Sequence, residues 1–487
     1  MASLMTSRNR HVDAFQADSQ SFRIHEDAPS TEDTEMNESA LQEEDEAEQE
    51  NEPLEEEDGQ NSDYSDSSED EPPDEDSHFQ QDMEKLQNAF VGFRQKYRLI
   101  KRIGEGTFST VYKAEDLAYD KYDNSWDPDR ELDKWTPPPL KNSAGQSGTT
   151  PDQESQPQRR RKPKYVAIKK IYVTSSPSRI LNELELLHDL RGCDSVCPLI
   201  TAFRSTDQVV AILPYFRHAD FRDYFRKMTV PDMAIYLRSL FTALASVHAH
   251  NIIHRDIKPT NFLYDPETRR GVLVDFGLAE REGYDCRPCV CHDDPATRKM
   301  KLRPLVSSEK KGAYLREDTR PARRANRAGT RGFRAPEVLF KCTEQTTKID
   351  IWSAGVILLT ILSRRFPFFN SADDVEAMIE IATIFGRERM QRTALLHGCM
   401  FETTIPTIGK YGFSFEDIIL WSTERKETQE DEKLAIRFLE ECMQLDPSKR
   451  ISAEDALKRP FLRMGLDESV ETTSNAGDDD EMDILKA

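Results

Sequence analysis

The sequence has no long apolar run and few cysteines. Its longest apolar stretch, IWSAGVILLTIL at residues 351–362, is about half of the ~20 residues needed to span a bilayer, so it predicts a buried helix and no membrane attachment. The opening MASLMTSRNRHVDAF lacks the apolar segment of a secretory signal, and we expect an intracellular protein. Thiols inside cells are mostly reduced, so any cluster among the eight cysteines favours metal binding or catalysis over disulfide bonds.

Basic residues are nearly absent from the start of the chain. Residues 1–83 contain 28 Asp and Glu against 3 Lys and Arg, a net charge of −25, whereas the whole chain carries −23. The rest of the chain is therefore close to neutral. Because the first segment has little apolar surface to offset the entropy of ordering, we predict a disordered acidic tail over 1–83, and a second one over 466–487.

Between the tails, regular patterns alternate with two long insertions. Apolar residues at helical spacing predict a short helix within 84–96. Pro, Gly, Ser and Gln dominate residues 119–164, which predicts a flexible insertion between strands. Helical patterns prevail after about residue 231, apart from a second, non-periodic insertion at 280–329.

A glycine-rich segment, IGEGTFSTVYKAE at 103–115, lies between two strand patterns. Gly104 and Gly106 would let the backbone approach a polyphosphate, since no Cβ stands in the way. Ser109 replaces the third glycine of the usual kinase loop, and taken alone the segment fits a plain hairpin equally well. The candidate nucleotide contacts here are Ile103, Gly104, Glu105, Gly106, Thr107, Phe108, Ser109 and Val111.

The segment IIHRDIKPTNFL, residues 252–263, has the spacing of a protein-kinase catalytic loop. Asp256 would accept the proton of the substrate hydroxyl, and Lys258 would meet the transferred phosphate. Asn261 would hold a magnesium ion, and Asp275 in LVDFGLAE would be the second magnesium ligand. Phosphoryl transfer needs such positioning and charge neutralisation more than covalent help.

Lys169 in VAIK is predicted to orient the α- and β-phosphates of ATP and to be held by a carboxylate on the following helix. Glu183 is the best match for that carboxylate. Glu185 is the alternative, two residues on and therefore on a different helix face. Leu213, Pro214 and Tyr215 are predicted at the hinge between lobes, with Leu213 and Tyr215 beside the adenine.

Three further matches to the kinase pattern are structural. Thr330 in GTRGFRAPE is expected to bond near Asp256, a feature of serine/threonine kinases. Asp350 is expected to brace the catalytic loop. Glu337 and Arg450 are expected to form a buried ion pair.

The set and order of these motifs resemble the eukaryotic protein kinases. The expected fold is therefore α+β, with a small β-rich N-lobe over 84–215 and a large helical C-lobe over 216–465. The motifs GEGTFSTVY, ARRANRAGTRGFRAPEVLFKC and IATIFGRERMQRTALLHGCMFE, with the two insertions, closely resemble the fungal cell division cycle 7-related kinases, the catalytic subunits of the Dbf-four-dependent kinase. The resemblance covers roughly residues 84–464, although a late C-lobe insertion of many relatives is short or missing.

That resemblance implies a kinase that is nearly inactive without a Dbf-four-type regulatory subunit. Its substrates would be subunits of the MCM helicase at replication origins, and its location the nucleus. It would act on Ser or Thr followed by an acidic or phosphorylated residue. A constitutive acidophilic kinase and a pseudokinase scaffold are the competing functions. The two insertions argue against the first, and intact Lys169, Asp256, Asn261 and Asp275 argue against the second.

Basic residues support acidic substrates independently. Residues 298–334 hold thirteen Lys and Arg against three acids, a net charge of +10. Guanidinium groups bind carboxylates and phosphates with two parallel hydrogen bonds, so we interpret part of this run as substrate recognition. Nucleic acid is the competing target, although no sequence-specific binding to it is expected. The substrate-recognition candidates are Thr330, Arg320, Arg323, Arg324, Arg327, Arg331 and Arg334.

A second cluster in the same insertion, GYDCRPCVCHDD, contains Cys286, Cys289, Cys291 and His292. The first pair has zinc-knuckle spacing, and the family resemblance also implies a Cys and His metal cluster here. Residues 293–329 contain no Cys or His. Either these four close a structural zinc site, or a fourth ligand comes from elsewhere in this chain or from the partner. Unliganded thiols are the alternative.

Three other segments carry weaker hypotheses. QRRRKPK at 158–164 is either a nuclear import signal or a solvated loop end. Acidic residues follow Ser62, Ser65 and Ser68, which would make the N-terminal tail a substrate of the enzyme itself. Met482, Ile484 and Leu485 follow a run of acids near the end of the chain and are predicted to dock on the regulatory subunit.

Overall fold

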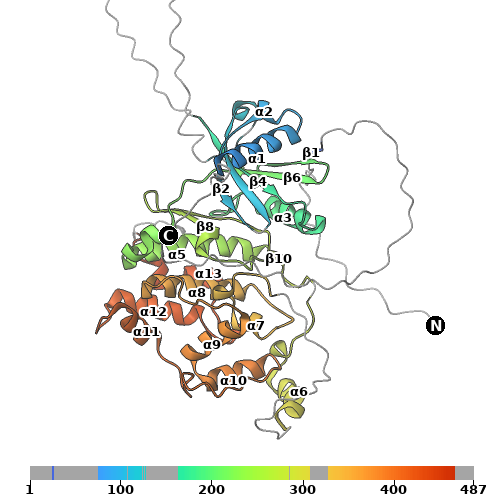
Figure 1. Ribbon diagram of the computed structural model, residues 1–487. Helices are drawn as coiled ribbons and strands as arrows, with labels where there is room; N and C mark the ends of the chain where they lie inside the picture. The colour runs from blue at the N-terminus through green and yellow to red at the C-terminus, as the bar shows by residue number, and fades with distance from the viewer. Residues whose placement is uncertain are drawn as a thin grey trace, which may run out of the picture.

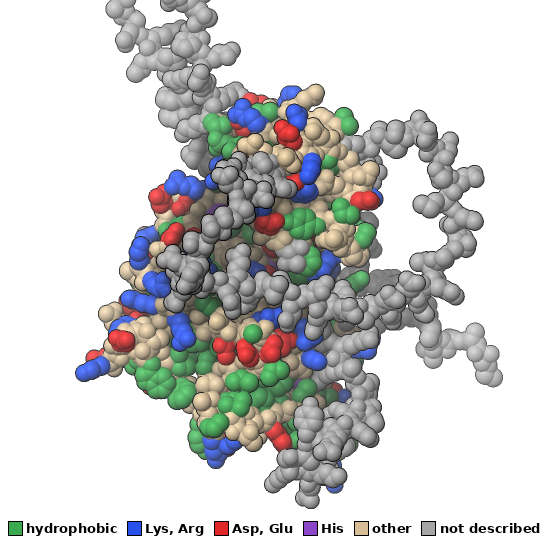
Figure 2. Space-filling model, in the orientation of Figure 1, with side chains coloured by type: hydrophobic (Ala, Val, Ile, Leu, Met, Phe, Trp, Pro, Cys, Tyr) green, Lys and Arg blue, Asp and Glu red, His purple; other side chains and the backbone are tan. Residues whose placement is uncertain are grey.

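The computed structural model describes residues 25–26, 75–106, 108–122, 124, 127, 163–284, 286–307 and 327–466. They form a sheet-rich N-terminal lobe and a larger helical C-terminal lobe (Figure 1). On the face drawn in Figure 2, both lobes carry Lys and Arg as well as Asp and Glu side chains, in line with the near-neutral balance expected after residue 83.

A twisted six-stranded sheet forms the N-lobe, in the order β1-β5-β6-β4-β3-β2. The central strand β4 places Val166 and Ile168 in an apolar cluster on one side of the sheet, whereas Lys169 belongs to the opposite side because side chains alternate along a strand. The strands are β1 (His25–Glu26), β2 (Tyr97–Glu105), β3 (Ser109–Asp116), β4 (Tyr165–Ile171), β5 (Thr201–Ser205) and β6 (Gln208–Pro214).

Two helices before β2 cover one face of this sheet. They are α1 (Glu75–Ala89) and α2 (Phe93–Lys96), and between them Gly92 has φ 71°, a conformation that glycine adopts without strain. Leu86, Phe90 and Phe93 are buried against the sheet. The predicted tail boundary at residue 83 was therefore wrong. Glu75 and Asp76 open α1, so the composition of its first turn resembles that of the tail.

The helix α3 (Pro177–Asp189) packs on the other face of the sheet, toward the C-lobe. It buries Leu184, Leu186 and Leu187 in the large core that both lobes share, and Glu183 is buried with them. Proline at its first position suits a helix start, since the missing N–H would have no partner there.

The C-lobe is built around α5 (Val230–Ala249) and α8 (Lys348–Ser363). All residues of α8 after the first are buried, which confirms the buried helix predicted for the longest apolar run. No helix among the described residues is long and apolar enough to cross a membrane. The remaining helices are α4 (Phe221–Tyr224), α6 (Pro295–Ser307), α7 (Pro336–Leu339), α9 (Asp374–Phe385), α10 (Arg387–Leu396), α11 (Phe415–Thr423), α12 (Glu430–Cys442), α13 (Ala453–Leu457) and α14 (Pro460–Arg463).

Two short two-stranded sheets lie between the lobes and support the candidate site. In them β7 (Ile252–Ile253) pairs with β10 (Glu280–Arg281), and β8 (Phe262–Asp265) pairs with β9 (Arg270–Leu273). The insertion predicted to be non-periodic contains a 3₁₀ turn and then α6, which lies at the edge of the C-lobe (Figure 1). Several predicted features lie outside the described residues. They are most of the first insertion, most of both predicted tails, and the serines and apolar residues singled out in those tails.

The packing of α1 predicts its contribution to stability. Leu86 is fully buried, so Leu86→Ala should lower the free energy of unfolding by about 2–5 kcal/mol. Val91 is 84% exposed in the following loop, and Val91→Ala should change the free energy of unfolding by less than about 0.5 kcal/mol. Chemical denaturation of the two variants measures the difference. Equal effects would contradict the packing of α1 on the sheet.

Candidate active site

Lys169 lines a cavity between the lobes. Its Nζ is 2.6 Å from Glu183 Oε1 on α3 and 2.8 Å from Asp275 Oδ1. Of the two glutamates considered for this contact, Glu183 makes it, whereas Glu185 is exposed on another face of α3. Burial alone would lower the pKa of Lys169, but the two carboxylates raise it above its usual value, so the ammonium remains charged.

Asp275 is the second acid in this group. The charge of Lys169 lowers the pKa of Asp275 to about 2, although burial acts in the opposite direction. Its backbone has φ 66°, a left-handed conformation that is uncommon outside glycine. Backbone strain of this kind persists only where the surroundings hold it, as the ion pair with Lys169 does here.

Asp256 lies at the edge of the same cavity and receives hydrogen bonds from three residues. Thr330 donates to its Oδ1 through the backbone N–H at 3.0 Å and through the hydroxyl at 2.7 Å. Its Oδ2 is 3.0 Å from Asn261 Nδ2 and 2.9 Å from Lys258 Nζ. Burial would raise the pKa of Asp256, but Lys258 and Thr330 together lower it, so the carboxylate is ionised at neutral pH.

Asp350, on α8, supports the loop that carries Asp256. This fully buried carboxylate accepts the backbone N–H of His254 and that of Arg255, each at 2.9 Å. His248 Nε2 lies 3.0 Å from the same carboxylate. Burial would raise the pKa of Asp350, but the hydrogen bond and charge of His248 and the backbone N–H groups lower it below its usual value.

The cavity has a volume of about 310 Å³ and lies under the glycine-rich segment. Of the candidate nucleotide contacts, Gly106, Phe108, Ser109 and Lys169 line it. The guanidinium of Arg179 on α3 stands 4.6 Å from the centre of the Phe108 ring, which joins the tip of the segment to that helix. Thr107 lies outside the described residues.

The other candidate contacts lie on the neighbouring strands. Val111 on β3 is the register partner of Lys169 on β4, and Leu213 on β6 is the partner of Ala167. Tyr215 follows β6, and the ammonium of Lys113 lies 4.1 Å from its ring centre. The candidate nucleotide contacts that do not line the cavity are Ile103, Gly104, Glu105, Val111, Leu213 and Tyr215. The cavity therefore spans the end of the site that holds Lys169 and Asp256.

Arg450 and Glu337 form the expected buried ion pair. Two guanidinium nitrogens lie 2.6 and 3.0 Å from the two oxygens of Glu337, and Arg450 also donates to the carbonyl of Gln444. Because both side chains are fully or almost fully buried, removal of either would leave an unpaired charge in the core. The pair anchors α7, at the end of the segment that contains Thr330, to the lower part of the C-lobe.

Three of the predicted substrate-recognition arginines are described, and each already has a partner. Arg327 Nη1 lies 2.9 Å from Asp374 Oδ2, and Arg334 pairs with the other oxygen of that carboxylate. Arg331 donates to the carbonyl of Ala372. Arg320, Arg323 and Arg324 lie outside the described residues.

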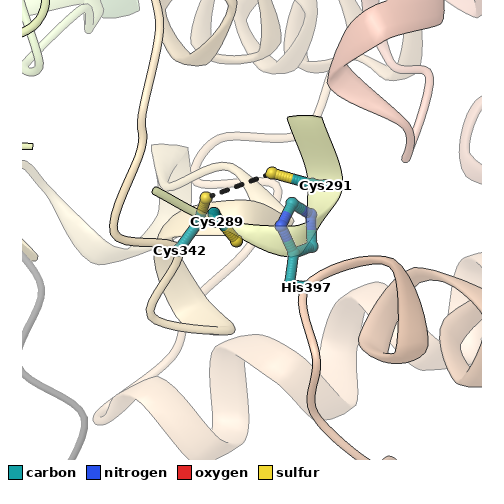
Figure 3. A group of neighbouring side chains, drawn as sticks. All are labelled: Cys289, Cys291, Cys342 and His397. Atoms are coloured by element: carbon teal, nitrogen blue, oxygen red, sulfur yellow. Dashed lines mark hydrogen bonds between the residues drawn. The ribbon is translucent and has the colours of Figure 1, made fainter. Parts of the chain in front are cut away.

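A second group of side chains lies in the C-lobe, away from Asp256. Ligand atoms of Cys289, Cys291, Cys342 and His397 lie within 4.8 Å of one another. Figure 3 shows the three sulfurs and the imidazole turned toward one another from different parts of the chain. The Sγ atoms of Cys291 and Cys342 are 3.7 Å apart. We call these four residues the cysteine cluster.

The ligand set predicted within the insertion was wrong for two of its four members. Cys286 is exposed, and the Nε2 of His292 lies 3.2 Å from the carbonyl of Glu344. The backbone turns in a 3₁₀ helix directly after Cys289, so adjacent residues 291 and 292 point in different directions. Cys342 and His397 complete the cluster, which is the alternative of a ligand from elsewhere in this chain.

Hydrogen bonds within the cysteine cluster shift the pKa values of its thiols in opposite directions. The contacts with Cys291 and Cys342 lower the pKa of the Cys289 thiol well below its usual value, whereas the contact with Cys289 and burial raise the pKa of the Cys291 thiol to about 12. Three sulfurs and one imidazole nitrogen are the ligand number and type of a structural zinc site. Both residues that the prediction missed stand in the family-like motifs ending VLFKC and containing LLHGC, but their spacing of more than fifty residues from the knuckle gives no local signal.

Comparisons with known proteins agree with this geometry. Residues 148–292 and 312–462 match the family model of the protein kinase domain. The cell cycle serine/threonine-protein kinase hsk1 of Schizosaccharomyces pombe is 50% identical over 396 residues, which cover 78% of this chain and 75% of that protein. The cell cycle protein kinase spo4 of the same organism is 43% identical over 394 residues, 77% of this chain and 87% of the relative. The mouse cell division cycle 7-related protein kinase is 28% identical over 438 residues, 65% of this chain and 71% of the relative.

A two-lobed fold with Lys169, Asp256 and Asp275 around an interlobe cavity defines a protein serine/threonine kinase. Among these kinases, the chain belongs to the cell division cycle 7-related family, in its fungal form. The resemblance read from its motifs is thereby confirmed.

The depressed pKa of Asp350 predicts how stability depends on pH. A carboxyl whose pKa is lower in the folded state stabilises the fold above its unfolded pKa of about 3.9, and this contribution is lost as pH falls through the folded value. Asp350→Asn should therefore cost about 1–3 kcal/mol at pH 7, through poorly matched buried N–H donors. The cost should shrink as the pH falls below about 4.

Thermal unfolding at pH 7 and in steps below pH 5 measures this effect. Glu267→Gln is the control for the loss of one negative charge, because its side chain is 74% exposed. A cost of Asp350→Asn that stays constant down to the lowest pH would contradict the assigned role of its ionised form.

Proposed function

We propose that this chain is the catalytic subunit of a Dbf-four-dependent type of kinase, which transfers the γ-phosphate of ATP to Ser or Thr next to acidic or phosphorylated residues. The observation that carries the proposal is the group formed by Asp256, Lys258 and Thr330 at the edge of the cavity that holds Lys169. The MCM helicase subunits as substrates, the regulatory subunit and a nuclear location follow from the family.

Each residue of the site has a separate task in this proposal. Asp256, held by Thr330 and Asn261, is the acceptor for the hydroxyl proton of the substrate. Lys258 is 2.9 Å from it and neutralises charge on the transferred phosphate. Lys169, kept in place by Glu183, orients the α- and β-phosphates.

Asn261 and Asp275 fit the oxygen ligands that magnesium prefers. Asn261 donates hydrogen bonds to Asp256 through Nδ2, so its oxygen is the atom left to act as a ligand. Magnesium, when bound with ATP, supplies charge neutralisation on the phosphates. The side chain of Asp275 is 47% exposed, on the side of the cavity, while it contacts Lys169.

Activity measurements test the proposal on the full chain, alone and together with a co-expressed regulatory subunit. With the subunit present, peptides carrying phosphoserine or Asp after the serine should be phosphorylated much faster than a peptide carrying Lys. Without the subunit, none of the three should be phosphorylated. Asp256→Asn should abolish transfer, and Glu183→Gln should lower it far more than the matched variant Glu185→Gln, because only Glu183 contacts Lys169.

Three outcomes would contradict the proposal. Folded Asp256→Asn protein with a tenth of the wild-type turnover would remove the assigned base. Full activity without the subunit would favour a constitutive acidophilic kinase. Inactivity of the wild-type complex on all three peptides would favour a pseudokinase scaffold.

The cysteine cluster supports a second, structural part of the proposal, a zinc ion held by Cys289, Cys291, Cys342 and His397. These residues come from the insertion, from the loop between α7 and α8, and from the end of α10. Cys342 is nearly fully buried, and Cys289 also donates its N–H to Glu344 at 2.8 Å. Bound zinc would connect the insertion to the C-lobe beside the segment that contains Thr330, while magnesium serves the chemistry.

Metal analysis of the purified complex should find about one zinc per chain. Cys342→Ser and Cys289→Ser should each remove it and lower the melting temperature. The matched variant Cys286→Ser should retain both the zinc and the melting temperature, because Cys286 is exposed and outside the cluster. Loss of zinc in Cys286→Ser with retention in Cys342→Ser would instead support the ligands first predicted within the insertion.

A further inference from the structure

Two arginines of the substrate-recognition set already hold a carboxylate of this chain. Asp374 is the first residue of α9, and its two oxygens are shared between Arg327 and Arg334. Guanidinium groups would contact the carboxylate or phosphate of a substrate in the same way. Asp374 therefore imitates the chemical group that these arginines are proposed to recognise.

Arg334 is bonded to the segment that contacts the proposed base. Arg334 Nε donates to the carbonyl of Gly329 at 2.8 Å, and the next residue, Thr330, is bonded to Asp256. Gly329 has φ 105°, and a Cβ there would stand 2.3 Å from the carbonyl oxygen of Arg255, so this segment is pressed against the catalytic loop. A substrate whose hydroxyl meets Asp256 would also lie close to the segment of Gly329 and Thr330, since both residues line the cavity and Thr330 is bonded to Asp256.

Asp374 is held in place by more than the arginines. The preceding Asp373 caps α9 by accepting the N–H groups of Val375 and Glu376, each at 2.8 Å. A carboxylate in the first turn of a helix is favoured by the positive end of the helix dipole. The contact still lies within reach of solvent, because the side chains of Asp374 and Arg327 are 21% and 42% exposed.

We propose that, without substrate, Asp374 occupies the position of the acidic group that follows the phosphoacceptor, and that binding of an acidic substrate displaces it. The proposal rests on the proposed function, since it concerns the same arginines. By pairing with Arg327 and Arg334, Asp374 prevents unrelated anions from binding to them. It also lowers the affinity for every anionic substrate, because the substrate must replace this contact. Phosphate carries about −1.5 to −2 charges and three acceptor oxygens, so it competes with Asp374 better than a carboxylate does.

Steady-state kinetics of the full chain with its regulatory subunit test this position. The peptides carry Ala, Asp or phosphoserine after the serine. Asp374→Asn should lower KM about two- to fivefold for the Asp and phosphoserine peptides, with unchanged kcat and unchanged KM for the Ala peptide. Glu376→Gln is the control, because Glu376 has the same charge in the same turn but accepts the backbone N–H of Ala372 instead. It should leave all three KM values unchanged.

A combined variant tests whether Asp374 acts through the arginines. With Arg327→Gln and Arg334→Gln in place, the further change Asp374→Asn should no longer lower any KM. Asp374→Ser is a second variant, since serine also suits the start of a helix, and its KM values should follow those of Asp374→Asn.

The outcomes separate this proposal from the proposed function. If wild type prefers acidic peptides and Asp374→Asn changes all three peptides alike, or raises KM for the acidic ones, Asp374 merely supports the loop or the arginines and the present proposal is wrong. If wild type uses the Ala and phosphoserine peptides equally well, acid-directed recognition itself is wrong, and the proposal for Asp374 is lost with it.

Discussion

The candidate site depends on one buried carboxylate, that of Asp350. It accepts two consecutive backbone N–H groups, those of His254 and Arg255, which can point in one direction because Arg255 has φ 69°. Such a turn would be strained without the anion that it encloses. Since Asp256 is the next residue, its position follows from that of Asp350. The helix α8 that carries Asp350 is buried on every side, which gives the catalytic loop a rigid support.

The charges around the cavity are paired across distant segments. Lys169 from the N-lobe joins Asp275, which follows β9, while Arg255 of the catalytic loop lies 2.8 Å from Glu280 of β10. Each pair therefore requires both segments to be in place. Because buried charges are costly unless paired, the arrangement of the site and the folding of the two lobes support each other.

The sequence predicted those parts of the molecule whose residues stand close together in the chain. The spacing from Asp256 to Asn261 is enough to predict that their side chains meet, since both belong to one turn of the loop. The match to the kinase pattern favoured Glu183 over Glu185, and uniform hydrophobicity identified α8. In each case a local rule was enough, because the tertiary contacts reinforce what the short segment already favours.

The sequence did not predict contacts between residues that meet only through the tertiary fold. His397 joins the cysteine cluster because α10 packs beside the insertion, and no spacing rule connects the two. No sequence pattern singled out Asp374, because its contact with Arg327 and Arg334 depends on how α9 lies against the end of the activation segment. The start of α1 was missed for another reason, because its first residues, EDSHFQQD, have the acidic and polar composition of a tail.

The cysteine cluster also has a consequence for the order of assembly. Cys289 and Cys291 leave the ribosome well before Cys342, and His397 follows later still. A site that needs all four cannot close until the chain through α10 has been made and has packed. Before that point the insertion has contacts with the loop after α7, such as those of Cys289 and His292 with Glu344. A nascent chain stalled before residue 397 would hold Cys289, Cys291 and Cys342 without the imidazole that completes the cluster.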